Sequence, residues 1–100
     1  MLRFSIEPEL LSAFCRAHGV HKLSLFGSVL KGTAQPQSDI DLLVEFEPEA
    51  HPTLLDLAAM EEELSRLLGG RRIDLRTASE LSRHFREQVL RTAEVQYVAR

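Results

Sequence analysis

The stretch Asp39–Phe46, with the sequence DIDLLVEF, is the segment that decides the fold. Its even-numbered positions are all apolar, and this period of two is typical of a β-strand that buries one face. The first two odd-numbered positions are Asp39 and Asp41, so two carboxylates lie on the other face, which they share with Leu43. The sequence therefore predicts a strand that joins a buried face to a pair of acidic side chains.

Similar patterns predict helices and strands on both sides of this strand. Pro8 is suited to the first turn of a helix and Gly19 to its end. The remaining expected elements are a strand over 22–26, a short helix over 29–31, a helix over 53–68, a strand over 71–76, a helix that opens with a capping box at 77–80 and runs to 92, and a short strand over 95–98. This order predicts an α/β (α+β) fold, in which a small mixed β-sheet is covered by helices.

Length and composition narrow the class of protein. A chain of 100 residues with 44% hydrophobic residues suffices for one modest core, so we expect a single domain over residues 1–100. No run approaches the roughly 20 apolar residues of a membrane span, and the first residues lack the apolar stretch of a signal peptide, so we expect a cytoplasmic protein. The single Cys15 reads as a small buried hydrophobic residue.

Charge is distributed unevenly along the chain. The net charge is −3, which gives no general basic field for nucleic acid. From Asp39 to Glu63 there are nine acidic residues and no lysine or arginine, whereas Arg71–Arg100 carries seven arginines against four acids. The first of these stretches favours metal ions and the second favours phosphates or an acidic partner.

One constellation carries the candidate chemistry: Gly27-Ser28, ten further residues, and then Asp39-Ile40-Asp41. A strand that runs through Gly-Ser into a helix presents backbone N–H groups to an anion, and the Ser28 hydroxyl adds a donor. Two aspartates that point the same way from a strand suit Mg²⁺, which prefers one or two carboxylates together with substrate phosphates. Asp74 is a candidate third ligand if its strand neighbours the first.

With these residues the chain resembles the minimal nucleotidyltransferases, or MNT domains, which have the DNA polymerase β-type catalytic fold. The resemblance rests on residues 25–28, Gly32, residues 38–44 and residues 73–75, and it covers nearly the whole chain. It implies that Gly27 and Ser28 bind the phosphates of ATP. It also implies that Asp39, Asp41 and Asp74 hold two Mg²⁺ and that Asp74 helps to deprotonate the acceptor hydroxyl.

The same resemblance implies a partner and a reaction. Proteins of this type often act as antitoxins to a HEPN-type ribonuclease toxin, by transferring AMP to a tyrosine of the toxin. Two other functions stay open at this point: an antitoxin that acts by binding alone, and nucleotidyl transfer to a nucleic-acid end. The net charge of −3 disfavours the latter.

Structural roles for the acidic residues also stay open. Asp41 could pair with Arg72, and Asp74 could be a strand residue bridged to Arg72 or Arg76. In that case Asp56 or Glu45 would be the next candidate for a third ligand. The basic side chains of Lys31, Arg71, Arg72 and Arg76 are expected to be solvated surface charges, with contact to phosphate or acceptor as the alternative.

Overall fold

The computed structural model describes residues 6–26, 40–77 and 83–99. Its elements follow the order α1 (Pro8–Ala17), β1 (Val20–Phe26), β2 (Ile40–Phe46), α3 (Leu54–Leu67), β3 (Ile73–Thr77), α4 (Arg83–Thr92) and β4 (Glu94–Val98). The expected mixed α/β order is thus confirmed. The expected helix over 29–31 and most of the predicted capping box at 77–80 lie outside the described residues.

Four predicted strand boundaries are wrong: β3 ends at Thr77 instead of residue 76, β4 begins at Glu94 instead of residue 95, and the beginnings of β1 and β3 differ by two residues each. β1 begins at Val20 instead of residue 22, because Val20 already pairs with Phe46 across an irregularity in the β1–β2 register. β3 begins at Ile73 instead of residue 71. Before β3, the Arg72 carbonyl still accepts a hydrogen bond of 2.8 Å from the Ile40 amide. This bond aligns the beginning of β2 with the beginning of β3.

The sheet has four strands in the order β3-β2-β1-β4. β1 pairs antiparallel with both β2 and β4, whereas β2 and β3 pair in parallel. Parallel neighbours need a crossover connection, and α3 supplies it. The sheet is therefore mixed, as the sequence predicts.

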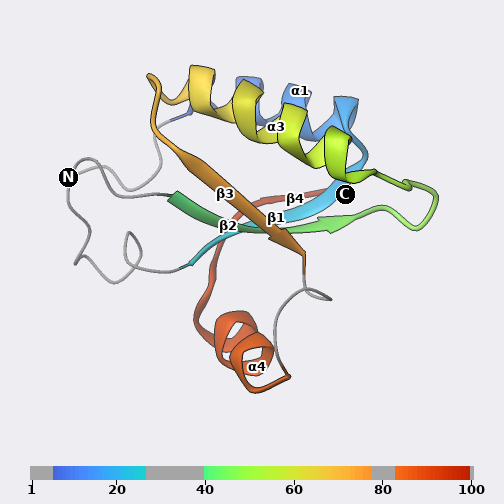
Figure 1. Ribbon diagram of the computed structural model, residues 1–100, viewed down its shortest axis with the longest axis vertical. Helices are drawn as coiled ribbons and strands as arrows, with labels where there is room; N and C mark the ends of the chain where they lie inside the picture. The colour runs from blue at the N-terminus through green and yellow to red at the C-terminus, as the bar shows by residue number, and fades with distance from the viewer. Residues whose placement is uncertain (1–5, 27–39, 78–82, 100) are drawn as a thin grey trace.

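Helices cover both faces of the sheet (Figure 1). α1 and α3 lie side by side over one face, and the main core forms there from residues such as Phe14, Leu25, Leu42 and Leu64. α4 lies on the opposite side, where Val89 packs with Phe26 and Leu43 in a second, smaller core. The sheet is thus the middle layer of three.

Three side chains fix α3 in its place. Its beginning is a complete capping box, in which the Asp56 amide donates to the Thr53 hydroxyl (3.1 Å) and the Thr53 amide donates to the Asp56 carboxylate (2.8 Å). Further along, the Glu61 carboxylate accepts a hydrogen bond of 2.8 Å from the Leu75 amide of β3. Glu61 is therefore partly buried, whereas the sequence pattern placed it mostly outside.

Candidate active site

The candidate site is built at the beginnings of the two parallel strands. Asp41 of β2 is the register partner of Asp74 of β3. The residues on either side of each aspartate, including the pair Leu42 and Leu75, belong to the core beneath α1 and α3. Because side chains alternate along a strand, both aspartates lie on the other face, toward α4.

This register brings two carboxylates together from positions that are far apart in the chain. Neighbouring strands are about 4.8 Å apart, so the backbones of the two aspartates lie directly side by side. The sequence prediction that Asp74 lies beside Asp41 if the strands are neighbours is confirmed. Neither aspartate is fully buried, since both have intermediate exposure.

A third strand ends at the same place. Phe26, the last residue of β1, is the cross-strand partner of Asp41. Gly27 and Ser28, the predicted phosphate-binding residues, follow Phe26 directly in the sequence, and Asp39 precedes Ile40, the first residue of β2. These three predicted site residues lie outside the described part of the chain, so the described site consists of Asp41 and Asp74.

An arginine neutralises part of the negative charge at this pair. Nη2 of Arg76 donates a hydrogen bond to Oδ2 of Asp74 over 3.1 Å, and the Asp74 side chain is 30% exposed. The alternative contact between Asp74 and Arg76 is therefore present in the structure. A partly exposed pair of this kind contributes little to stability, typically about 0–1 kcal/mol, so a divalent cation can compete for the carboxylate.

Asp56 and Glu45, the two alternative candidates for a third metal ligand, lie on different faces of the sheet. Asp56 caps the beginning of α3, which covers the opposite face of the sheet, so its nomination as a ligand is wrong. Glu45 follows Asp41 by four residues on β2 and therefore lies on the same face. Within the described ranges, no group of three or more His, Cys, Asp or Glu side chains is gathered closely enough to hold a metal ion.

The pattern of Asp39–Phe46 identified the acidic face but not what covers it. Leu43 lies on that face two residues beyond Asp41, and it is fully buried because Val89 of α4 packs over it in the second core. α4 thus covers the part of this sheet face that lies next to the aspartates. The apolar Leu43 within an otherwise acidic face was the one signal of this contact in the sequence.

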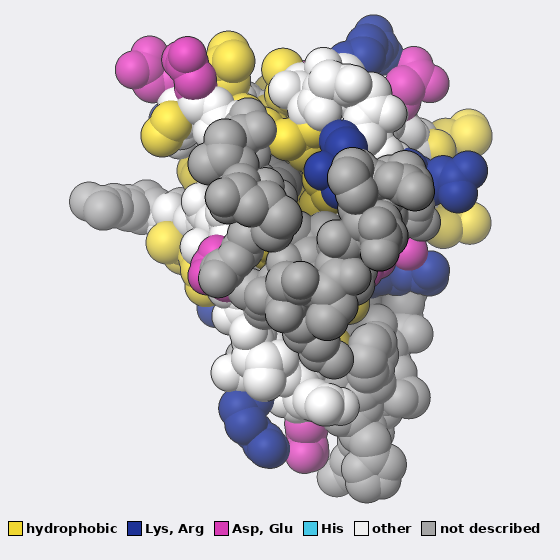
Figure 2. All heavy atoms as spheres, turned by 90° about the vertical axis from the view of Figure 1, so that its left-hand side faces the viewer, with side chains coloured by type: hydrophobic (Ala, Val, Ile, Leu, Met, Phe, Trp, Pro, Cys, Tyr) yellow, Lys and Arg dark blue, Asp and Glu magenta, His cyan; other side chains and the backbone are white. Residues whose placement is uncertain are grey.

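On the face drawn in Figure 2, the basic side chains of the described residues lie among acidic and apolar ones. In the described part of the chain, no helix has the length and apolar character needed to cross a membrane. The buried Cys15 thiol has a pKa raised from 9.0 to about 12 by its removal from water, so its predicted role as a buried hydrophobic residue is confirmed.

Comparisons with known proteins define the class. The nucleotidyltransferase domain family matches residues 7–96. The protein adenylyltransferase MntA of Thermococcus cleftensis is 44% identical over 80 residues, which are 80% of this chain and 76% of that protein. A solved structure described as a minimal nucleotidyltransferase is 43% identical, with a TM-score of 0.70 over 86% of this chain and 85% of that chain.

A more distant structure shares the fold alone. It is the complex of a tri-AMPylated Shewanella oneidensis HEPN toxin with an MNT antitoxin, at 17% identity and a TM-score of 0.65 over 92% of this chain and 70% of that chain. Together the fold, the aspartate pair and these matches define an enzyme that transfers nucleotides. The chain belongs to the nucleotidyltransferase domain family and resembles its minimal members.

Proposed function

We propose that this nucleotidyltransferase transfers AMP from ATP to a hydroxyl group of a partner protein. The observation that carries the proposal is the register of Asp41 with Asp74, which puts two partly exposed carboxylates on one face of the sheet. The acceptor we propose is a tyrosine of a HEPN-type toxin, so the protein acts in the cytoplasm as an antitoxin. The activity named for the Thermococcus relative and the AMPylated toxin in the Shewanella complex support this acceptor.

We assign Asp39, Asp41 and Asp74 to the binding of two Mg²⁺, and Gly27 and Ser28 to the binding of the ATP phosphates. The donor set fits Mg²⁺, because carboxylates from adjacent strands are the oxygen ligands that this ion prefers. Bound Mg²⁺ supplies positive charge that neutralises the triphosphate and the leaving pyrophosphate and favours ionisation of the acceptor hydroxyl.

The reaction is an in-line displacement at the α-phosphorus of ATP. The acceptor oxygen forms a bond to that phosphorus, and the bond from the phosphorus to pyrophosphate breaks. We assign to the Asp74 carboxylate the removal of the hydroxyl proton. Most of the catalytic effect then comes from positioning and from charge stabilisation, since no covalent intermediate on the protein is needed.

The decisive experiment compares Asp74→Asn with Asp41→Asn. The chain is co-expressed with its HEPN-type partner, and the intact mass of the partner is measured for added AMP. We expect Asp74→Asn to keep Mg²⁺–ATP affinity near that of the unmodified protein while transfer falls by about 10²–10⁴-fold, the usual loss for a general base. Asp41→Asn should weaken both binding and transfer, because it removes a ligand of the ion that bridges ATP to the protein.

Glu49→Gln is the matched control. Glu49 is exposed in the turn after β2, away from the aspartates, so this loss of one carboxylate should leave both binding and transfer unchanged. Transfer by Asp74→Asn at the unmodified rate would assign Asp74 a structural role through its contact with Arg76. A partner that carries no AMP, yet is still neutralised in a stable complex with Asp41→Asn, would show that the antitoxin acts by binding alone.

A further inference from the structure

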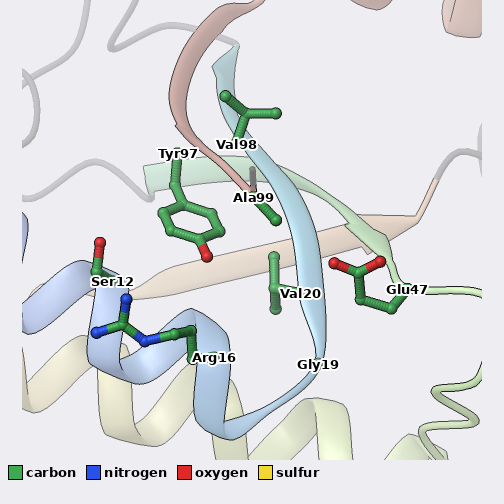
Figure 3. Close-up of a pocket in the computed structure, with 8 residues that line it drawn as sticks. All are labelled: Ser12, Arg16, Gly19, Val20, Glu47, Tyr97, Val98 and Ala99. Carbon is green, nitrogen blue, oxygen red and sulfur yellow. The ribbon is translucent and has the colours of Figure 1, made fainter.

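A hollow lies at the opposite end of the molecule from the aspartates. It has a volume of about 630 Å³ and lies between α1, the beginning of β1, the residue after β2 and the end of β4 (Figure 3). Val20 lines it, and Phe26, the partner of Asp41, is six residues further along β1. At roughly 3.3 Å per residue, this separates the hollow from the aspartates by roughly 20 Å.

The hollow also belongs to the other face of the sheet. Val20 and Tyr97 pack with the core beneath α1 and α3, whereas Asp41 and Asp74 face α4. Neither Asp41 nor Asp74, the two candidate site residues that the structure describes, lines it. A ligand bound there would therefore contact neither of these two carboxylates.

Three hydrogen-bond donors converge on this hollow. Ser12 and Arg16 are one helical turn apart on α1, and Tyr97 faces them from β4 (Figure 3). Across the described ranges, none of these three side chains forms a hydrogen bond or an ion pair with another group. Arg66 and Arg76, by contrast, are both paired with carboxylates. The hollow is thus lined by a guanidinium and two hydroxyl groups whose hydrogen-bond donors are available to a ligand.

The remaining walls limit the charge of a ligand. Glu47 lines the hollow, and its carboxylate lies 3.4 Å from Nδ1 of His21. With one guanidinium and one carboxylate at the same hollow, a single negative charge on the ligand is matched better than a double one. Val20 and Ala99 add apolar surface, and the volume is within the range of small-molecule sites.

We propose that this hollow binds a small organic monocarboxylate. The ligand carboxylate accepts hydrogen bonds from Arg16, Ser12 and Tyr97, and its apolar body packs against Val20 and Ala99. The site is separate from the one that handles ATP, and its occupancy stabilises the contact between α1 and β4. This assignment does not depend on the identity of the acceptor protein.

The test uses benzoate as the probe and follows the backbone amides of the full chain by nuclear magnetic resonance. We expect benzoate to shift amides in the second half of α1 and at the end of β4, with benzamide and inorganic phosphate binding much more weakly. Arg16→Gln should lower the benzoate affinity by at least about tenfold, since it removes a hydrogen bond between charged groups. Tyr97→Phe should lower it by about two- to tenfold, since it removes one hydrogen bond from a neutral donor.

Arg66→Gln is the matched control, because Arg66 is an exposed arginine of α3 that pairs with Glu62 and does not line the hollow. It should bind benzoate as the unmodified protein does. Unchanged affinity in Arg16→Gln, equal binding of benzamide, or tighter binding of phosphate would each overturn the proposal. None of these outcomes bears on AMP transfer, which Asp41→Asn tests separately.

Discussion

Leu43→Ala should destabilise the protein strongly, because Leu43 joins the sheet to α4. The Leu43 side chain is 0% exposed and packs with Phe26 and Val89. Removing a buried leucine costs the transfer free energy of the lost atoms and leaves a cavity, which together amount to about 2–5 kcal/mol. A domain of this size has a free energy of unfolding of about 5–15 kcal/mol, so this single change removes a large part of the total.

Equilibrium unfolding in urea measures this loss. With a slope of about 1–3 kcal/mol per molar urea, a loss of this size lowers the midpoint by about 0.7 M or more. Leu54→Ala is the matched control, because Leu54 is 82% exposed at the first position of α3. The control should change the free energy of unfolding by no more than about 0.5 kcal/mol.

Hydrogen exchange of the backbone amides shows which helix loses stability in Leu43→Ala. The second core contains three buried residues in the described part of the chain, against thirteen in the main core beneath α1 and α3. Leu43→Ala should therefore accelerate exchange of the α4 amides more than exchange of the α1 amides. A loss below about 1 kcal/mol, or a loss equal to that of Leu54→Ala, would refute the idea that Leu43 anchors α4.

Three further predictions concern the helices of the main core. The Cys15 thiol, with its pKa raised to about 12 by burial, should react with iodoacetamide at pH 8 at least about 10³-fold more slowly in the folded protein than in denaturant; equal rates would contradict the burial. The stability that its neutral form contributes is complete below pH 9.0 and is lost as the pH rises toward 12, so unfolding of Cys15→Ala should depend less on pH in that window. Thr53→Ala should cost about 1 kcal/mol in urea unfolding, because it removes the hydroxyl that caps α3, whereas Thr53→Ser should restore the cap.

Much of the fold could be predicted from local patterns. The alternation in Asp39–Phe46 predicted β2 and both of its faces, and the spacing of leucines predicted α3. Register could not be predicted in this way, because it depends on which strands become neighbours. The position of Asp41 beside Asp74 follows from the parallel pairing of β2 with β3.

The contacts that the sequence did not predict join distant parts of the chain. Leu43 was expected on the acidic face, but its burial depends on Val89, which comes from the last helix. The hollow is formed by Arg16 near the beginning of the chain and Tyr97 near its end. Single-element periodicity carries no information about such pairs, so they emerge only from the packing of whole elements.

The hydrogen bond from the Leu75 amide to Glu61 affects whether separate molecules can associate through their sheets. β3 is an outer strand of the sheet, and the backbone donors of an outer strand are where a strand from another molecule attaches during aggregation. The Glu61 carboxylate already accepts from one of these donors and places a negative charge beside that border. An incoming chain would have to displace a charged acceptor before it could add to the sheet, so α3 protects the protein from self-association for as long as α3 remains folded.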